Sequence, residues 1–210
     1  MTELHRFQPP LVAILRGLTL AEAQPLGRAL FDAGFRLLEV PLNRPGALEC
    51  IAALKAMAPA DALVGGGTML STSDVDNVYA AGGRLMVAPN CDAEVVRRAR
   101  DLGMFAAPGI ATPSEAFAAL RYGAHALKIF PADMVGLAGL KAFKSVLPPG
   151  TPLWPVGGVA PESVEAWVNA GATGFGIGSQ LFQAGVSPSV LGTRAQAFLA
   201  AWARAKPAAE

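Results

Sequence analysis

The stretch LVAILRGLTLAEAQPLGRALFDAGFRLLEVPLN, residues 11–43, contains one strand–helix–strand unit. Its two ends, LVAILRG and LLEVPLN, are short apolar runs with the length of buried strands. Between them, Thr19 and Glu22 have the spacing of a capping box, which predicts the start of a helix. Gly34 predicts the end of that helix. Because a crossover between parallel strands needs a long connection, usually a helix, this stretch favours a parallel sheet.

The same unit recurs along the chain. Thr112 and Glu115 repeat the capping-box spacing, and Pro113 suits the first turn of the helix that follows them. Further helix ends are predicted at glycines that precede an apolar run, namely Gly82, Gly103, Gly123 and Gly171. The eight strand candidates are LVAILRG, LLEVPLN, LVGGGTM, LMVAPN, FAAPGI, ALKIFP, LWPVGG and GFGIGS.

Eight such units in 210 residues predict an α/β fold, a closed (β/α)8 TIM barrel with residues 1–210 as a single domain. An open doubly wound sheet is the alternative. Such a sheet normally has a glycine-rich nucleotide fingerprint after its first strand, whereas this chain continues with Arg16-Gly17-Leu18. We therefore favour the barrel.

Composition and charge exclude several functional classes. The net charge is +1 and basic clusters are absent, so we expect no nucleic-acid partner and no membrane-surface partner. No apolar run could span a bilayer and the N-terminus does not resemble a signal peptide, so we expect a cytoplasmic protein. The two cysteines form no CxxC pair and the two histidines are far apart, so we expect no metal site and no cofactor.

Polar residues interrupt four strand candidates near their carboxyl ends, where barrel active sites lie. Side chains alternate along a strand, so Lys128, between Leu127 and Ile129, is expected to point into the barrel. Glu39, between Leu38 and Val40, is expected to point inward by the same alternation. Two further residues belong to this predicted constellation, Arg16 and Thr68.

A lysine in an apolar strand has two interpretations. Lys128 and Glu39 could form a buried ion pair with a structural purpose, although such pairs stabilise proteins weakly. Alternatively, apolar surroundings lower the lysine pKa, and the free amine attacks a substrate carbonyl to form a Schiff base. Glu39 would then move protons, with a pKa raised by burial and lowered by Arg16, so that the direction of its net shift stays open. We favour the second interpretation.

Two glycine turns follow the last two strand candidates. Gly157-Gly158 lies in VGGVAPES, residues 156–163, and Gly178-Ser179 lies in GFGIGSQ, residues 174–180. Loops after strands seven and eight are the usual phosphate site of this barrel, where backbone amides are available to an anion. Two tight turns without a ligand are the alternative. A phosphate site predicts a substrate with a phosphate at one end and a carbonyl at the other.

With these motifs identified, the chain resembles the 2-keto-3-deoxy-6-phosphogluconate/6-phosphogalactonate aldolases over nearly its full length. The matching motifs are VAILRG, DAGF..LEVPLN, GGGTM, VAPN, ALKIFPA, PVGGV and GIGS. The resemblance implies a class I aldolase, typically a homotrimer, that reversibly cleaves a phosphorylated keto-deoxy sugar acid to pyruvate and glyceraldehyde 3-phosphate. It implies Lys128 as the Schiff-base residue and Glu39 as the proton shuttle. The remaining positions that it implies are Arg16 and Thr68 for substrate, Asn90 and Phe130 for the pocket lining, and Gly157, Gly158, Gly178 and Ser179 for phosphate.

Two departures favour the galactonate branch of this family. The gluconate enzymes commonly have Thr-Leu-Arg where this chain has Pro41-Leu42-Asn43, so Arg16 or Arg44 would have to bind the substrate carboxylate. They also tend to have Thr where this chain has Val156, which cannot hydrogen-bond a C4 hydroxyl. The alternatives are a gluconate aldolase of the same family, a phosphate-binding barrel isomerase or synthase, and a sugar-phosphate binding protein without catalysis.

Overall fold

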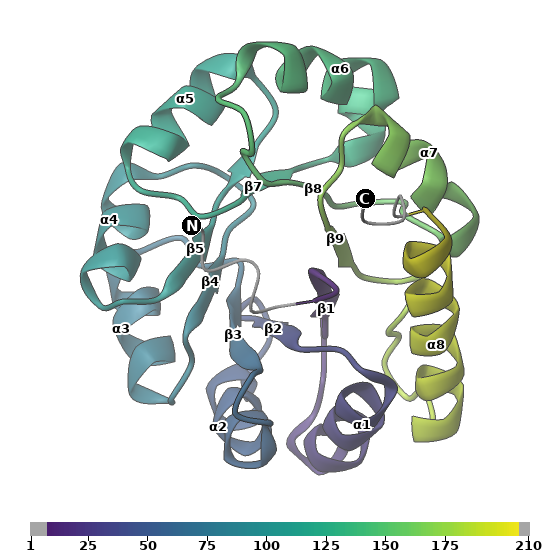
Figure 1. Cartoon of the computed structure of the whole chain (residues 1–210). Helices are drawn as coiled ribbons and strands as arrows, with labels where there is room; N and C mark the ends of the chain where they lie inside the picture. Colours follow the sequence, from purple (N-terminus) through teal and green to yellow (C-terminus); the bar gives the residue numbers. More distant parts are fainter. Residues whose placement is uncertain (1–7, 206–210) are drawn as a thin grey trace.

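The computed structural model describes residues 8–205, in which parallel strands alternate with helices. Figure 1 shows the helices as an outer ring around the strands. The strands are β1 (Leu11–Ile14), β2 (Leu37–Pro41), β3 (Leu63–Gly67), β4 (Leu85–Val87), β5 (Phe105–Ala107), β6 (Gly109–Ile110), β7 (Leu127–Ile129), β8 (Leu153–Pro155) and β9 (Phe175–Ile177). The α-helices are α1 (Leu20–Ala33), α2 (Ala47–Met57), α3 (Thr72–Ala80), α4 (Ala93–Asp101), α5 (Pro113–Arg121), α6 (Ala132–Val146), α7 (Val164–Ala170) and α8 (Pro188–Ala205).

The strands form two parallel sheets, with orders β5-β4-β3-β2-β1-β9 and β6-β7-β8. The predicted parallel α/β architecture is thus confirmed. The predicted single closed sheet of eight strands is not, because the strands pair as two separate sheets. The candidate FAAPGI is divided at Pro108, which has no N–H for a ladder hydrogen bond, into β5 and β6. Backbone contacts nevertheless join the sheets: His125 N donates to Ala106 O at 2.9 Å, and Val156 pairs with Gly176.

The apolar core has two parts that follow the strand alternation. The larger part lies between strands and helices and includes Leu38, Val40, Leu127 and Ile129. The smaller part lies on the opposite strand faces, inside the ring, and comprises Val12, Leu37, Leu85, Val87, Phe105, Ala107, Ala126 and Trp154. The Phe105 and Trp154 rings stack with centroids 5.6 Å apart. Trp154 is the register partner of Lys128 across β7 and β8, so this stack lies beside the lysine.

The predicted helix ends are confirmed. Gly34 ends α1 and Gly171 ends α7, both with positive φ, the conformation that glycine adopts without cost. At the start of α1, Thr19 N donates to the Glu22 carboxylate at 3.1 Å. At the start of α5, Thr112 N donates to Glu115 at 2.9 Å.

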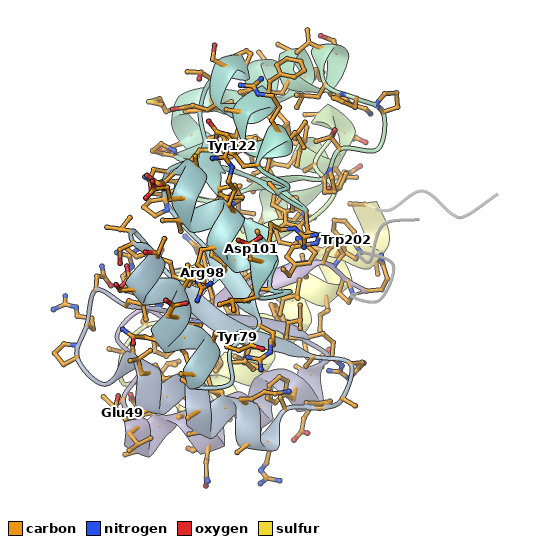
Figure 2. All side chains as sticks on the ribbon, turned by 90° about the vertical axis from the view of Figure 1, so that its left-hand side faces the viewer. Glu49, Tyr79, Arg98, Asp101, Tyr122 and Trp202 are labelled. Carbon is orange, nitrogen blue, oxygen red and sulfur yellow. The ribbon has the colours of Figure 1, made fainter. Side chains whose placement is uncertain are left out.

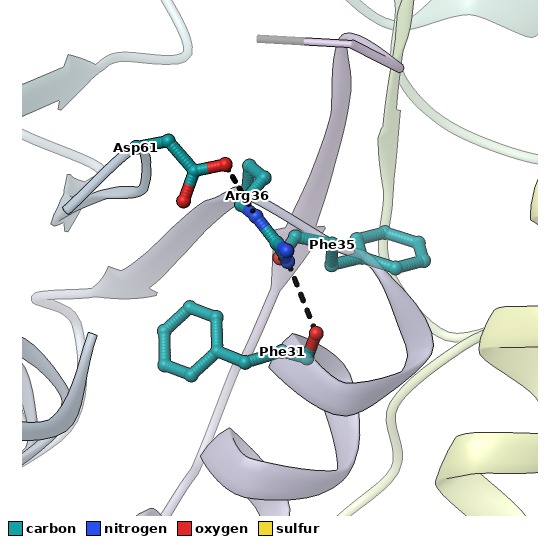
Figure 3. A network of polar contacts seen from close by, with 4 residues as sticks. All are labelled: Phe31, Phe35, Arg36 and Asp61. Atoms are coloured by element: carbon teal, nitrogen blue, oxygen red, sulfur yellow. Dashed lines mark hydrogen bonds and ion pairs between the residues drawn. The ribbon is translucent and has the colours of Figure 1, made fainter. Parts of the chain in front are cut away.

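Arg36 connects the end of α1 to the loop before β3 (Figure 3). Its guanidinium donates to the carbonyl oxygens of Phe31 at 3.0 Å and Phe35 at 2.9 Å, and to Asp61 at 2.9 Å. A cation at a helix carboxyl end interacts favourably with the unpaired carbonyls there. This contact fixes the chain where it enters β2, the strand that carries Glu39.

Charged and aromatic side chains connect neighbouring helices on the side of the molecule in Figure 2. Arg98 on α4 pairs with Asp76 on α3 at 2.7 Å, and the Arg97 guanidinium lies 4.8 Å from the Tyr122 ring centroid. Exposed pairs of this kind contribute little to stability, about 1 kcal/mol or less. Within residues 8–205, no helix is both long and apolar enough to cross a membrane.

Candidate active site

Lys128 on β7 and Glu39 on β2 both lie inside the ring. The residues are 8% and 2% exposed, respectively, and their sequence neighbours belong to the core on the helix side. The two side chains line one small cavity whose other side chains are apolar: Val12, Ile14, Val87, Ala107, Trp154 and Val156. The strand alternation seen in the sequence therefore gave the correct direction for both.

Burial dominates the electrostatics of this pair. It lowers the pKa of Lys128, with a further lowering by Arg16 and an opposing effect of Glu39. It raises the pKa of Glu39 from 4.5 to about 7, against the charges of Lys128 and Arg16. The direction that the sequence left open is thus upward. The site thus makes the amine easier to deprotonate than an exposed lysine, and places it beside a carboxyl group that near neutral pH can both hold and release a proton.

The structure does not support a tight structural ion pair. Within residues 8–205, the ion pairs of 4.0 Å or less are Arg36–Asp61 and Arg98–Asp76, and Lys128–Glu39 is not among them. The buried Glu39 Oε2 has no hydrogen-bond partner among the described residues. A buried carboxyl oxygen without a partner costs free energy, so it is more readily explained by a role toward a ligand.

Gly67 makes room for the Glu39 carboxyl group. A Cβ atom at Gly67 would overlap Glu39 Oε2, and β2 and β3 pair along this stretch, with Pro41 opposite Gly67. From the sequence, Gly67 was identified only as part of the strand candidate LVGGGTM. The available signal was a glycine inside a strand, which weakens the strand and often marks a close approach.

The two glycine turns lie on one open cavity of about 290 Å³. Gly157 and Gly158 have φ values of 113° and 67°, so side chains there would be strained. After them a 3-10 turn, Pro161–Ser163, leads into α7. After Gly178 the chain makes a turn, with Leu181 N donating to Gly178 O at 2.9 Å, and α8 begins only at Pro188. A helical segment therefore begins soon after Gly157-Gly158 but not soon after Gly178-Ser179.

This open cavity brings together most of the predicted binding residues. Its lining includes Arg16, Phe130, Val156, Gly157, Gly158, Gly178 and Ser179. It also includes Gln180, which directly follows the Gly178-Ser179 turn, and Phe182, two positions further on; neither was predicted from the sequence. Ile14, Val156 and Gly176 line both this cavity and the inner cavity at Lys128. One elongated ligand could therefore reach the glycine turns and the lysine together.

Three other candidate residues lie away from this open cavity. Thr68, half-buried after β3, has φ of 54° and is the only non-glycine residue with positive φ within residues 8–205. Such backbone strain is common at functional sites. Asn90 is exposed, and its carbonyl accepts from Gly109 N at 3.1 Å. Arg44 shares a separate outer cavity with Arg16.

Among the described residues, no three His, Cys, Asp or Glu side chains are grouped so as to hold a metal ion.

Comparisons with known proteins agree with this geometry. The chain is 45% identical over 196 residues to the 2-dehydro-3-deoxy-6-phosphogalactonate aldolase of Escherichia coli strain K12, covering 93% of this chain and 96% of the relative. It is 33% identical to a 2-dehydro-3-deoxy-phosphogluconate aldolase of Pseudoalteromonas atlantica, covering 74% and 72%. A solved structure described as native KDPGal aligns with a TM-score of 0.92 at 44% identity, covering 94% and 96%.

A family model described as "Aldolase: KDPG and KHG aldolase" matches residues 4–190. This range is most of the chain and contains every candidate residue discussed above. The chain belongs to the KDPG and KHG aldolase family.

Proposed function

We propose that this protein is a class I aldolase that reversibly cleaves 2-dehydro-3-deoxy-6-phosphogalactonate to pyruvate and glyceraldehyde 3-phosphate. The observation that carries the proposal is the buried Lys128 amine close to Glu39, in an inner cavity that adjoins the glycine turns. The relative with 45% identity bears the galactonate name, which supports this substrate over its epimer.

The chemistry follows from the two side chains. The Lys128 amine adds to the C2 carbonyl, and the resulting carbinolamine loses water with a proton from Glu39, leaving an iminium. The Glu39 carboxylate then takes the C4 hydroxyl proton, the C3–C4 bond breaks, and its electrons form an enamine while the aldehyde leaves. Glu39 returns this proton to C3, and hydrolysis of the resulting iminium releases pyruvate, restores the lysine amine and gives a proton back to Glu39. A carboxyl group with a pKa of about 7 suits both directions of proton transfer.

The two charged ends of the substrate have separate candidate sites. The backbone amides of Gly157, Gly158 and Gly178, with the Ser179 hydroxyl, suit the phosphate because all four residues line the open cavity. For the carboxylate we favour Arg16 over Arg44, because Arg16 lines the open cavity and its charge acts on both Glu39 and Lys128. Thr68 and Asn90 are proposed as further substrate contacts at the ends of neighbouring strands.

We expect the galactonate substrate to be cleaved faster than the C4-epimeric gluconate substrate. Val156 lies between the open and inner cavities and offers no hydrogen bond to a C4 hydroxyl. Val156→Thr adds a hydroxyl at constant shape and should shift the ratio of kcat/KM values toward gluconate by about tenfold. Val156→Ala, which loses methyl groups without gaining a donor, is the matched control. Pyruvate release from each epimer measures the ratio; an equal shift in both variants would contradict the hydrogen-bond explanation.

We expect Gly67→Ala to fold and to lose turnover by about 10²-fold, because its methyl group would displace the Glu39 carboxyl group. Gly192→Ala on α8 is the control: the new Cβ would meet no atom within 4 Å, and turnover should stay near wild type. Steady-state kcat for both variants, with circular dichroism for folding, makes the comparison. Equal kcat values for the two variants would refute the positioning role of Gly67.

We also infer that the two sheets form one closed (β/α)8 barrel in a single domain, with β5 and β6 as one strand interrupted at Pro108. The contacts from His125 to Ala106 and from Val156 to Gly176 support this closure.

A cytoplasmic homotrimer is the assembly that we propose. Exposed apolar side chains on α5 and α6, Phe117, Met134 and Leu137, are consistent with a protein interface.

A further inference from the structure

Phe130 lies against the amine of Lys128. The two residues are separated by one position at the carboxyl end of β7, so their side chains point to the same side. Lys128 Nζ lies 4.8 Å from the centroid of the Phe130 ring. Backbone hydrogen bonds fix both residues to the neighbouring segment: Lys128 N donates to the carbonyl oxygen of Pro108, between β5 and β6, at 3.0 Å, and Phe130 N donates to that of Ile110 on β6 at 3.1 Å. The ring and the amine are therefore held together by the sheet.

The surroundings of Lys128 Nζ give a positive charge little support. The lysine is 8% exposed, and most side chains lining its cavity are apolar. Arg16 lies near enough to disfavour a second cation, and Glu39 is the acidic group that faces the amine. The face of an aromatic ring carries negative potential and attracts a cation within about 6 Å, most strongly where water is excluded.

We propose that the face of the Phe130 ring stabilises the iminium cation formed at Lys128, a role beyond lining the pocket. The proposal rests on the Schiff-base function proposed above. In that step, a neutral amine, a carbonyl group and one proton give an iminium and one water. The positive charge thus appears on a nitrogen that already lies beside the ring. A side chain of similar volume without a negative face would line the pocket equally well and would give no such stabilisation.

This role has a pH signature that packing lacks. The lysine ammonium carries the same charge as the iminium, so the attraction of the ring cancels when imine forms from ammonium, at pH below the Lys128 pKa. Above that pKa, imine forms from neutral amine and the attraction counts in full. Weaker packing of pyruvate against the ring would instead reduce imine formation equally at every pH.

The test replaces Phe130 in the full-length protein by 3,4,5-trifluorophenylalanine, which keeps the ring shape and removes the negative face. Imine is trapped with borohydride over a series of pyruvate concentrations between about pH 6 and 10, a range that extends to the ordinary lysine pKa, and is quantified by mass spectrometry of the Lys128 peptide. The half-saturating pyruvate concentration should rise about tenfold at the alkaline end and stay unchanged at the acidic end. The same replacement at Phe143, buried on α6 in the helix-side core, should leave the half-saturating pyruvate concentration unchanged at both ends of the pH range.

Two results would overturn the role of Phe130 while leaving the proposed function intact, since wild-type Lys128 would still be trapped. One is a half-saturating concentration that fluorination leaves unchanged at all pH values. The other is a rise of the same size at every pH, which would assign the ring to packing alone. Absence of any adduct on wild-type Lys128 would overturn both this role and the aldolase mechanism.

Discussion

Treatment with pyruvate and borohydride is expected to attach the three-carbon unit covalently to Lys128, and to no other lysine in a folded sample. Borohydride reduces an iminium to a stable secondary amine, so the label marks the nitrogen that formed the Schiff base. Lys128 is the buried lysine in the described core, and burial lowers the pKa of its ammonium. Peptide mass spectrometry after proteolysis identifies the labelled residue.

Lys128→Met is the decisive variant, because it retains an unbranched apolar side chain of similar length in an apolar cavity. We expect it to fold, to lose the label, and to cleave the substrate about 10³-fold or more slowly, because without the lysine no iminium forms to accept the electrons of the broken C3–C4 bond. Lys141→Ala, at an exposed position on α6, is the control and should keep full labelling and activity. A label that persists in Lys128→Met, or a wild-type protein that takes none, would refute the Schiff-base assignment.

Local sequence rules predicted much of this fold. The eight strand candidates all contain strands, and Gly34 and Gly171 end helices because their positive φ values suit glycine. Alternation alone gave the inward direction of Lys128 and Glu39, because neighbours on a strand must face opposite sides. These features depend on residues close together in the sequence, where the geometry is fixed by the backbone.

Features that depend on distances between strands could not be predicted. The direction of the Glu39 pKa shift depends on whether burial exceeds the charges of Lys128 and Arg16, which only the three-dimensional arrangement decides. The clearance at Gly67 depends on the β2–β3 register. Likewise, the sequence could not decide between Arg16 and Arg44. Arg16 lies near the carboxyl end of one strand candidate and Arg44 directly follows the next, and only the cavity lining distinguishes them.

Glu39→Gln is expected to lower cleavage by about 10²- to 10⁴-fold, because an amide has nearly the same shape and cannot exchange a proton with the substrate. Binding of inorganic phosphate should be retained, since the glycine turns line a cavity from which Glu39 is absent. In wild type, the pH profile of kcat/KM should show a transition near 7 that reflects Glu39 and that the variant lacks. A variant with the full cleavage rate would exclude Glu39 as the proton shuttle.

Glu39→Gln should also change how stability depends on pH. The pKa of Glu39 is 4.5 in an ordinary environment and about 7 in the folded protein. Below pH 4.5 the group is protonated in both the folded and the unfolded protein. Between pH 4.5 and about 7 the folded protein retains a proton that the unfolded chain releases. The stability associated with protonated Glu39 is therefore lost as the pH rises through 7, and glutamine, which resembles the protonated form, avoids this loss.

Denaturant unfolding at about pH 5 and pH 8 measures the difference, with both values chosen on either side of the Glu39 transition. Relative to wild type, the free energy of unfolding of Glu39→Gln should rise between these conditions by on the order of 3 kcal/mol. The same comparison in a Lys128→Met background removes the titration of Lys128, whose pKa Glu39 influences. The exposed Glu49 on α2 provides the control, since Glu49→Gln removes a carboxylate that water already solvates. If the free energy of unfolding changes with pH by the same amount in Glu39→Gln and Glu49→Gln, burial does not raise the pKa of Glu39. Another cause would then be needed for Glu39 to act as an acid near neutral pH.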